Sequence, residues 1–214
     1  MPELPDVSVY VERLEALVGG EALEAVRLVS PFVLRTVEPP ISAAEGRAVR
    51  SVRRLGKRIV LELEGELFVV IHLMIAGRLR WKKRGIAVPK KNGLAAFDFP
   101  SGSLLFTEAS TKKRASIHLV EGEPGLEAHH RGGLEVMDAS PEAFAGALTR
   151  RNHTLKRALT DPRILSGIGN AYSDEILFSA GLSPFKLTQS LSPEELAHLH
   201  GHTKAVLRRF TENI

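Results

Sequence analysis

The chain has 214 residues, 43% hydrophobic and 25% charged, and its 29 basic and 25 acidic residues give a net charge of +4 and a pI near 9.5. This composition is typical of a globular protein with one large or two small domains. The absence of cysteine excludes disulfides and thiolate chemistry, and we expect neither a signal peptide nor a membrane span.

The first six residues, MPELPD, place a proline directly before a carboxylate. If Met1 is removed, the Pro2 nitrogen becomes a free secondary amine, of which roughly a tenth is unprotonated at pH 7. Such an amine can attack an electrophilic carbon and form an iminium, and Glu3 is placed to donate or accept the proton. Two alternatives stay open: Pro2 only opens a surface helix, or Met1 is retained and the Pro2 nitrogen is an unreactive amide.

Apolar spacing predicts a helix over 7–18, ended by Gly19-Gly20. Short β-branched or aliphatic segments then predict strands, which indicate a β-sandwich or barrel. These segments are 22–29, 32–38, 48–54, 58–64, 66–72, 76–81, 94–99, 103–107 and 115–120. A polar stretch rich in Gly and His over 121–133 is interpreted as a linker.

The remainder is predicted to be helical. Ser140 and Ser192 each precede a Pro-Glu pair, which is typical of a capped helix start, and Glu195 can complete a capping box. The last helix is expected over 196–210. We therefore predict a first domain over 1–124 and a helical domain over 125–214.

A Gly-x-Gly turn, Gly167 to Gly169, precedes a helix predicted to reach Ala180. The free N–H groups at such a helix start bind phosphate readily, and Asn170 adds a side-chain donor. An ordinary tight turn is the alternative. A dinucleotide fingerprint is excluded, because no βαβ unit surrounds the turn.

Four segments, PELP at 2–5, LGKR at 55–58, HLMIAGRL at 72–79 and GIGNAYSDEILF at 167–178, together resemble the formamidopyrimidine-DNA glycosylase/endonuclease VIII family of base-excision repair. The resemblance covers essentially the whole chain. It implies an α+β fold, in which an N-terminal antiparallel β-sandwich with a leading helix is followed by an all-α helix–two-turn–helix domain. DNA would lie in the cleft between the domains, near Pro2.

The resemblance also implies catalytic roles. Pro2 would attack C1′ of the damaged nucleotide, Glu3 would act as general acid/base, and Lys57 would hold a phosphate beside the lesion. Successive β and δ eliminations would then cut the strand, with no metal or redox cofactor in the reaction. The alternative for Lys57 is a solvated surface lysine.

DNA contacts follow from the same resemblance. His72 would contact the backbone, Gly169 and Asn170 would bind a phosphate, and Met74 would be the wedge that fills the gap left by the flipped base. Core packing is the alternative for Met74. The implied partner is double-stranded DNA with damaged bases or abasic sites, bound by a monomer in the bacterial cytoplasm, at the nucleoid and not at a membrane.

Basic clusters at 82–84, 90–91, 112–114 and 150–151 favour a nucleic-acid surface, although charge runs are often only solvated. Such contacts predict an affinity that falls steeply with salt. His198 and His202 would share a helix face, but no zinc-protease pattern surrounds them. We expect no metal site there.

The chain also departs from the family pattern. Asp6 stands where the family usually has glutamate, and we expect it to serve as a catalytic carboxylate with a shorter reach toward the sugar. The segment over 107–116 lacks the usual arginine–aromatic pair, and Lys113 or Arg114 is the candidate substitute for the arginine. The four-cysteine zinc finger that follows in most members is missing, so truncation is expected and a structural zinc would belong to a longer chain. The alternative function is a catalytically weak or silent DNA-damage binding protein.

Overall fold

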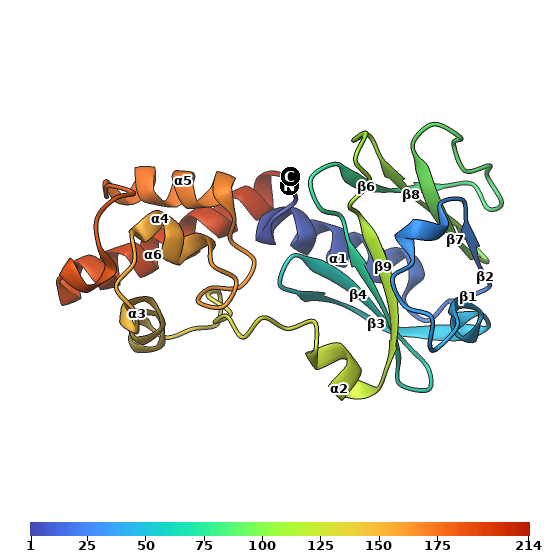
Figure 1. The fold of residues 1–214 in the computed structure, drawn as a ribbon, viewed down its shortest axis with the longest axis horizontal. Coiled ribbons are helices and arrows are strands. Elements are labelled where there is room, and N and C mark those ends of the chain that lie inside the picture. Colours follow the sequence, from blue (N-terminus) through green and yellow to red (C-terminus); the bar gives the residue numbers. More distant parts are fainter. The chain divides into compact units, whose positions relative to one another are not determined.

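The computed structural model describes residues 1–214 and divides into two compact units (Figure 1). Unit 1 comprises Met1–Pro2 and Tyr10–His129, and unit 2 comprises Glu3–Val9 and His130–Ile214. The boundary expected after residue 124 falls inside a short helix, α2 (Gly122–Glu127), which occupies much of the expected linker over 121–133. None of the helices combines the length and the apolar character that a bilayer crossing needs.

Helix α1 (Leu4–Val18) begins a turn earlier than predicted. The carboxylate of Asp6 accepts a hydrogen bond from the Glu3 backbone N–H at 2.9 Å, which satisfies a donor at the helix start. Leu4, Val7, Leu14 and Val18 form its buried face. The helix ends before Gly19-Gly20 as predicted, where Gly20 takes a φ of 81°.

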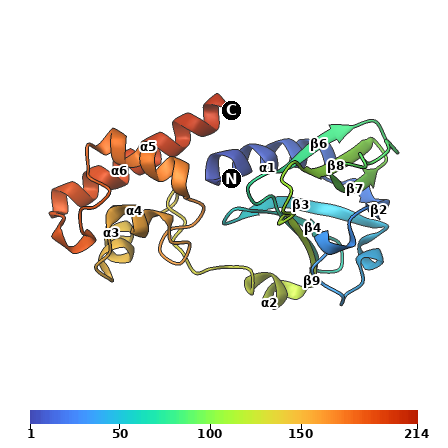
Figure 2. The same cartoon turned by 45° about the horizontal axis from the view of Figure 1, so that its top comes forward.

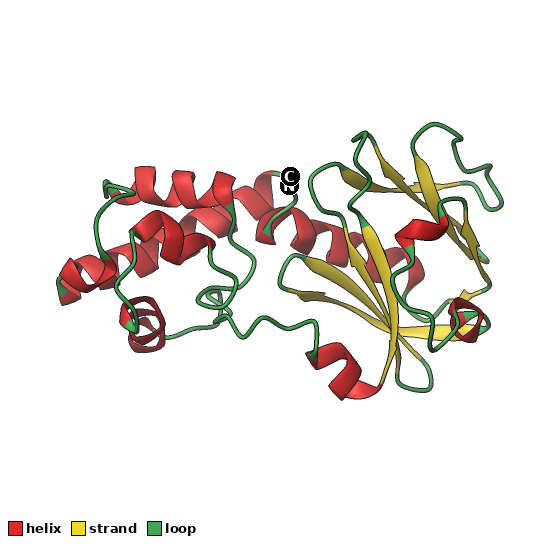
Figure 3. Ribbon diagram, in the orientation of Figure 1, coloured by secondary structure: helices red, strands yellow, loops and turns green.

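Unit 1 is an antiparallel sandwich of two sheets (Figure 3). The five-stranded sheet has the order β1 (Ala22–Leu23), β3 (Arg47–Leu55), β4 (Arg58–Leu63), β5 (Leu67–His72) and β9 (Ser116–Glu121). The four-stranded sheet has the order β2 (Ala25–Leu28), β7 (Gly93–Phe99), β8 (Gly102–Glu108) and β6 (Gly77–Lys82). Both faces of β7 and β8 are buried, so these strands are apolar or small at nearly every position.

Two strand predictions were wrong. The segment over 22–29 is not one strand: β1 pairs with β3 and β2 pairs with β7, so the chain changes sheets at Glu24. The segment over 32–38 forms a 3-10 turn, η1 (Pro31–Val33), followed by extended backbone with an isolated bridge at Leu34. A proline at the first position of η1 favours this turn, although Val33 is buried as it would be in a strand.

Unit 2 is helical apart from isolated bridges. Its helices are α3 (Pro141–Thr149), α4 (Leu155–Thr160), α5 (Asn170–Ala180) and α6 (Pro193–Asn213), and α5 lies along α6 (Figures 1 and 2). Both predicted caps are confirmed: Ser140 accepts from the Ala143 N–H, and Ser192 forms a capping box with Glu195. Leu4 of α1 belongs to the core of this unit.

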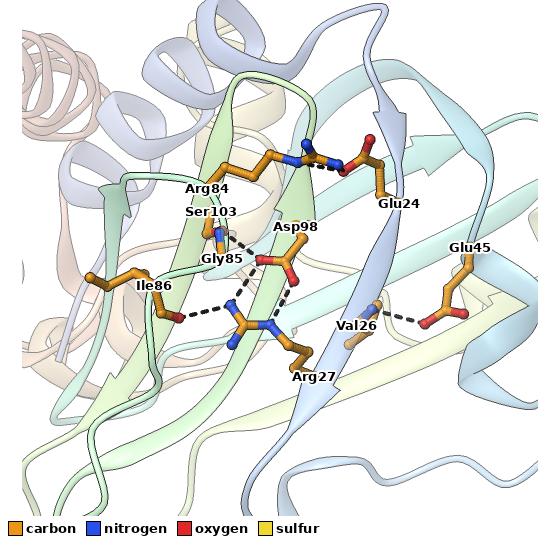
Figure 4. Close-up of polar contacts among 9 residues, drawn as sticks. All are labelled: Glu24, Val26, Arg27, Glu45, Arg84, Gly85, Ile86, Asp98 and Ser103. Carbon is orange, nitrogen blue, oxygen red and sulfur yellow. Dashed lines mark hydrogen bonds and ion pairs between the residues drawn. The ribbon is translucent and has the colours of Figure 1, made fainter.

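A polar cluster joins β2 to the two central strands of the four-stranded sheet (Figure 4). The Arg27 guanidinium donates to both carboxylate oxygens of Asp98, at 2.6 and 2.9 Å, and to the carbonyl of Ile86 at 2.9 Å. The Ser103 hydroxyl donates to the same carboxylate. The hydrogen bond from Arg27 is the main reason why the pKa of Asp98 lies below its usual value, and the bond from Ser103 adds to the effect.

We predict that Asp98→Asn lowers the free energy of unfolding of unit 1 by about 1–3 kcal/mol at pH 7, because Arg27 loses its charged partner. A carboxylate whose pKa is lowered by folding stabilises the protein above the unfolded pKa, and that contribution disappears as the pH falls through the folded pKa. The gap between wild type and variant should therefore narrow below about pH 4.

Urea unfolding followed by the fluorescence of Trp81, the one tryptophan, measures this on unit 1 itself. Arg50→Gln is the matched control, since the Arg50–Glu64 pair is exposed and lies in the other sheet, and it should contribute at most about 1 kcal/mol. Equal losses in the two variants would contradict the role assigned to Asp98.

Candidate active site

The Glu3 carboxylate binds the start of α5. Its side chain is buried, with 2% of its surface exposed. Its oxygens accept hydrogen bonds from the backbone N–H groups of Gly169 at 2.6 Å, Ala171 at 3.0 Å and Tyr172 at 3.3 Å. The Leu4 N–H donates to the carbonyl of Gly167 at 2.9 Å. Hydrogen bonds thus connect two consecutive residues, Glu3 and Leu4, to the Gly-x-Gly turn and the first residues of α5.

Three of the N–H groups at the start of α5, which were expected to bind a phosphate, are bound by Glu3 instead, and that of Asn170 is not among them. An anion does occupy the helix start, as the helix dipole favours, but it is the carboxylate of Glu3. The Gly169 N–H is therefore already used within the chain. Asn170 lies exposed in the first turn, and neither its side chain nor its backbone N–H is bound by Glu3.

Asp6 and Tyr172 surround Glu3. Asp6 is predicted from the sequence as a catalytic carboxylate, and in the structure it accepts from the Glu3 N–H. Burial raises the pKa of Tyr172 to about 12, and the negative charges of Asp6 and Glu3 add to this effect. The phenol therefore stays protonated at neutral pH, edge-on to Phe210 at 5.1 Å between ring centroids.

In unit 1, Lys57 and His72 lie at the same end of the five-stranded sheet. Lys57 is in the two-residue turn between β3 and β4, where Gly56 takes the positive φ of 61° that a tight hairpin needs. The strand register aligns Arg58, His72 and Ser116 across β4, β5 and β9. The structure thus brings together two predicted DNA-contacting residues that lie apart in the sequence.

Met74 occupies a strained turn next to that row. It follows β5, is only partly buried and has a φ of 51°, a left-handed conformation that costs a non-glycine residue roughly 1–2 kcal/mol. The turn is closed by a hydrogen bond from the Gly77 N–H to the carbonyl of Leu73. Met74 is not among the core residues, so core packing does not explain it, and strain of this kind is common at functional sites.

The segment over 107–116 folds around a buried carboxylate. Glu108, with 1% of its surface exposed, accepts from the backbone N–H groups of Arg114 and Ala115. The Lys113 ammonium binds the Glu108 carbonyl. The two candidate substitutes for the family arginine are both exposed. Lys113 is bound within the loop, whereas the Arg114 side chain forms no hydrogen bond or ion pair.

Comparison with known proteins decides the family. Residues 1–119 match the formamidopyrimidine-DNA glycosylase N-terminal domain, and residues 134–213 match the H2TH domain of the same enzymes. The chain belongs to the formamidopyrimidine-DNA glycosylase family. This confirms the predicted family and fold class and the predicted type of enzyme, a DNA glycosylase of base-excision repair.

Individual members of the family agree. The formamidopyrimidine-DNA glycosylase of Moorella thermoacetica is 33% identical over 100% of this chain and 79% of its own length. The crystal structure of the MutM (Fpg) protein from Thermus thermophilus has a TM-score of 0.84 at 31% identity, over 99% of this chain and 76% of that one. The Lactococcus lactis enzyme, solved non-covalently bound to DNA containing an abasic site, shares the fold with a TM-score of 0.88 at 23% identity, over 98% and 82% of the two chains.

Two contacts that join helices were not predicted from the sequence. The Lys156 ammonium donates to the Asn170 carbonyl at 2.8 Å and to the Asp174 carboxylate at 2.5 Å, so it ties α4 to the first turn of α5. His198 and His202 face α5, where His202 Nδ1 lies 2.8 Å from the Ser179 hydroxyl. A lysine eighteen residues from its carboxylate partner leaves no local sequence signal.

We predict that Glu3→Gln lowers the thermal stability of unit 2, because a buried amide replaces one acceptor oxygen with donors that face N–H groups. Hydrogen bonds to charged groups contribute about 1.5–3 kcal/mol each, so a loss of at least about 2 kcal/mol is expected. The decrease in helical circular dichroism on heating measures it. The control is Glu175→Gln, at an exposed position of α5, which should have the same melting temperature as the wild type. A Glu3→Gln variant with an unchanged melting temperature would refute the role of Glu3 in capping α5.

Proposed function

We propose that this glycosylase is also an abasic-site lyase, and that the Pro2 nitrogen is its nucleophile once Met1 has been removed. The anchoring of Glu3 on α5 carries the proposal. The Glu3 N–H is bound by Asp6 and the next N–H by Gly167, so the peptide that joins Pro2 to Glu3 has little freedom. The Pro2 nitrogen and the Glu3 carboxylate are thereby held in a fixed orientation relative to each other, which catalysis by orientation requires.

The chemistry needs only the amine and an acid/base group. The Pro2 nitrogen forms a bond to C1′ as the glycosidic bond breaks, and the base leaves with that electron pair and takes up a proton. The Glu3 carboxylate takes the proton from the newly bonded nitrogen and passes it to the ring oxygen, so that the C1′–O bond breaks and the sugar opens to an iminium. Removal of a C2′ proton then expels the 3′ phosphate, and a second elimination expels the 5′ phosphate.

We assign the residues that contact DNA in each unit separately. In unit 1, Lys57 and His72 at one end of the five-stranded sheet are assigned to backbone phosphates, and Met74 to the gap left by the flipped nucleotide. In unit 2, the exposed Asn170 is assigned to a phosphate. The proposed partner is duplex DNA with a damaged base or an abasic site, as in the Lactococcus lactis complex, bound by a single copy of the chain.

Borohydride trapping on abasic-site duplex tests the nucleophile, since borohydride reduces an iminium to a stable amine. The chain without Met1 should form a covalent adduct. The same chain with Met1 retained should form at least about 100-fold less, because its Pro2 nitrogen is an amide and its free amine, on Met1, lies one residue further from Glu3. Pro2→Gly, which offers a primary amine, should fall between the two. No adduct from any form, with DNA binding intact, would favour the silent damage-binding protein.

Met74→Gly separates the wedge from the fold. Glycine relieves the positive φ of this turn, so the thermal midpoint of unit 1 should stay unchanged or rise. Affinity for abasic-site duplex should fall about tenfold, since the inserted side chain is lost. Fluorescence anisotropy with abasic and intact duplexes measures the effect, and an equal affinity of variant and wild type for abasic DNA would refute the wedge.

A further inference from the structure

Unit 2 contains an arginine-lined cleft that the proposed reaction does not use. Its volume is about 590 Å³, and it is lined by residues of α3, the turn that follows it, α4 and the segment over 161–164. Figures 1 and 2 show α3 and α4 as neighbours within this unit. Four arginines line the cleft against a single carboxylate, and they are Arg150, Arg151, Arg157 and Arg163.

That carboxylate, Asp161, is already paired. Arg163 donates from Nε to one oxygen at 2.9 Å and from Nη2 to the other at 2.7 Å. These bonds lower the pKa of Asp161 to about 2, so the carboxylate stays ionised and balances Arg163 alone. Arg150, Arg151 and Arg157 are exposed and take part in no ion pair. The cleft therefore carries an uncompensated positive charge.

On the α3 side, small residues line the cleft. Ala143, Gly146 and Ala147 lie three and four positions apart on α3 and share one face. A Cβ added at Gly146 would meet no atom within 4 Å, so this surface is open. A bulky ligand can thus approach the backbone of α3 closely, between the guanidinium groups.

The same cations continue towards Asn170. Arg157 also lines two neighbouring cavities, of about 460 and 510 Å³. The first includes Arg131, and the second includes Lys156 and Asn170. Within unit 2, a row of basic side chains therefore connects the residue assigned to a phosphate with the cleft at Arg150.

We infer that this cleft binds the phosphodiester backbone of a duplex segment that flanks the damaged nucleotide. The guanidinium group matches phosphate oxygens in geometry and charge. No Phe, Tyr or Trp lines the cleft to stack a base, so it fits a backbone better than a nucleotide. The inference rests on the proposed action on DNA, and it adds a contact that lengthens the bound segment without reading its sequence.

The test compares duplexes of about 30 and about 10 base pairs, both undamaged, by fluorescence anisotropy over a range of salt concentrations. Arg150→Gln/Arg151→Gln should raise the Kd for the long duplex about tenfold near 0.1 M salt and reduce the salt slope by about 2. The short duplex should be affected much less. Arg208→Gln/Arg209→Gln removes the same charge from exposed positions of α6 and is the matched control.

A second pair of variants probes the α3 side of the cleft. Gly146→Glu adds a carboxylate to the arginine-lined cleft and should weaken binding of the long duplex about as much as the Arg150/Arg151 variant does. Gly146→Gln, a side chain of equal size without the charge, should weaken it less. Equal losses in the Arg150/Arg151 and Arg208/Arg209 variants, or no loss in either, would overturn the inference. The inference would also be overturned if inorganic phosphate displaced the long duplex from the wild-type chain but not from the Arg150/Arg151 variant. The cleft would then be a site for small anions.

Failure of the inference is distinguishable from failure of the proposed function. Binding of undamaged duplex requires neither the Pro2 amine nor an iminium. Borohydride trapping of the wild-type chain on abasic DNA measures the lyase separately, so a normal adduct combined with unaltered affinity in the Arg150/Arg151 variant would reject the cleft alone.

Discussion

The hydrogen bonds between Glu3 and the start of α5 are the interaction on which the candidate site depends. A buried carboxylate needs donors, and three N–H groups without intrahelical partners need an acceptor. Each requirement is met by the other. The result fixes the chain directly after Pro2, so the stability of α5 and the placement of the proposed nucleophile have a common origin in unit 2.

In unit 1, the constraint is different: polar side chains must reach solvent from a sandwich whose interior is apolar. Its strands β7 and β8 are buried along their whole length, and the side chains assigned to DNA stand instead at turns and strand ends. Lys57 and Met74 occupy such turns, and both turns use a positive φ, at Gly56 and at Met74 itself. The sandwich thus serves as a rigid support for exposed loops.

The sequence predicts what local patterns determine. The caps at Ser140 and Ser192 depend on residues three positions away, and most strands follow from short apolar segments, so both were predicted correctly. The change of sheets at Glu24 depends instead on which distant strand each half meets. The Glu3–Gly169 contact spans 166 positions, and the arginine cleft needs α3, α4 and a loop to meet. The family motifs identified the family, but not the partners that their residues use within the chain.

The division of α1 between the units has a consequence for biosynthesis. Unit 1 is almost contiguous, whereas unit 2 takes Glu3–Val9 from the other end of the chain. Glu3 and Gly169 are 166 positions apart. At a translation rate of about 5–20 residues per second, roughly 10–30 s separate the synthesis of the two partners. The sandwich can fold on the ribosome during that interval, while the residues that carry the proposed chemistry wait for their partner. The residues that carry the proposed chemistry are therefore made well before the partner that completes their hydrogen bonds.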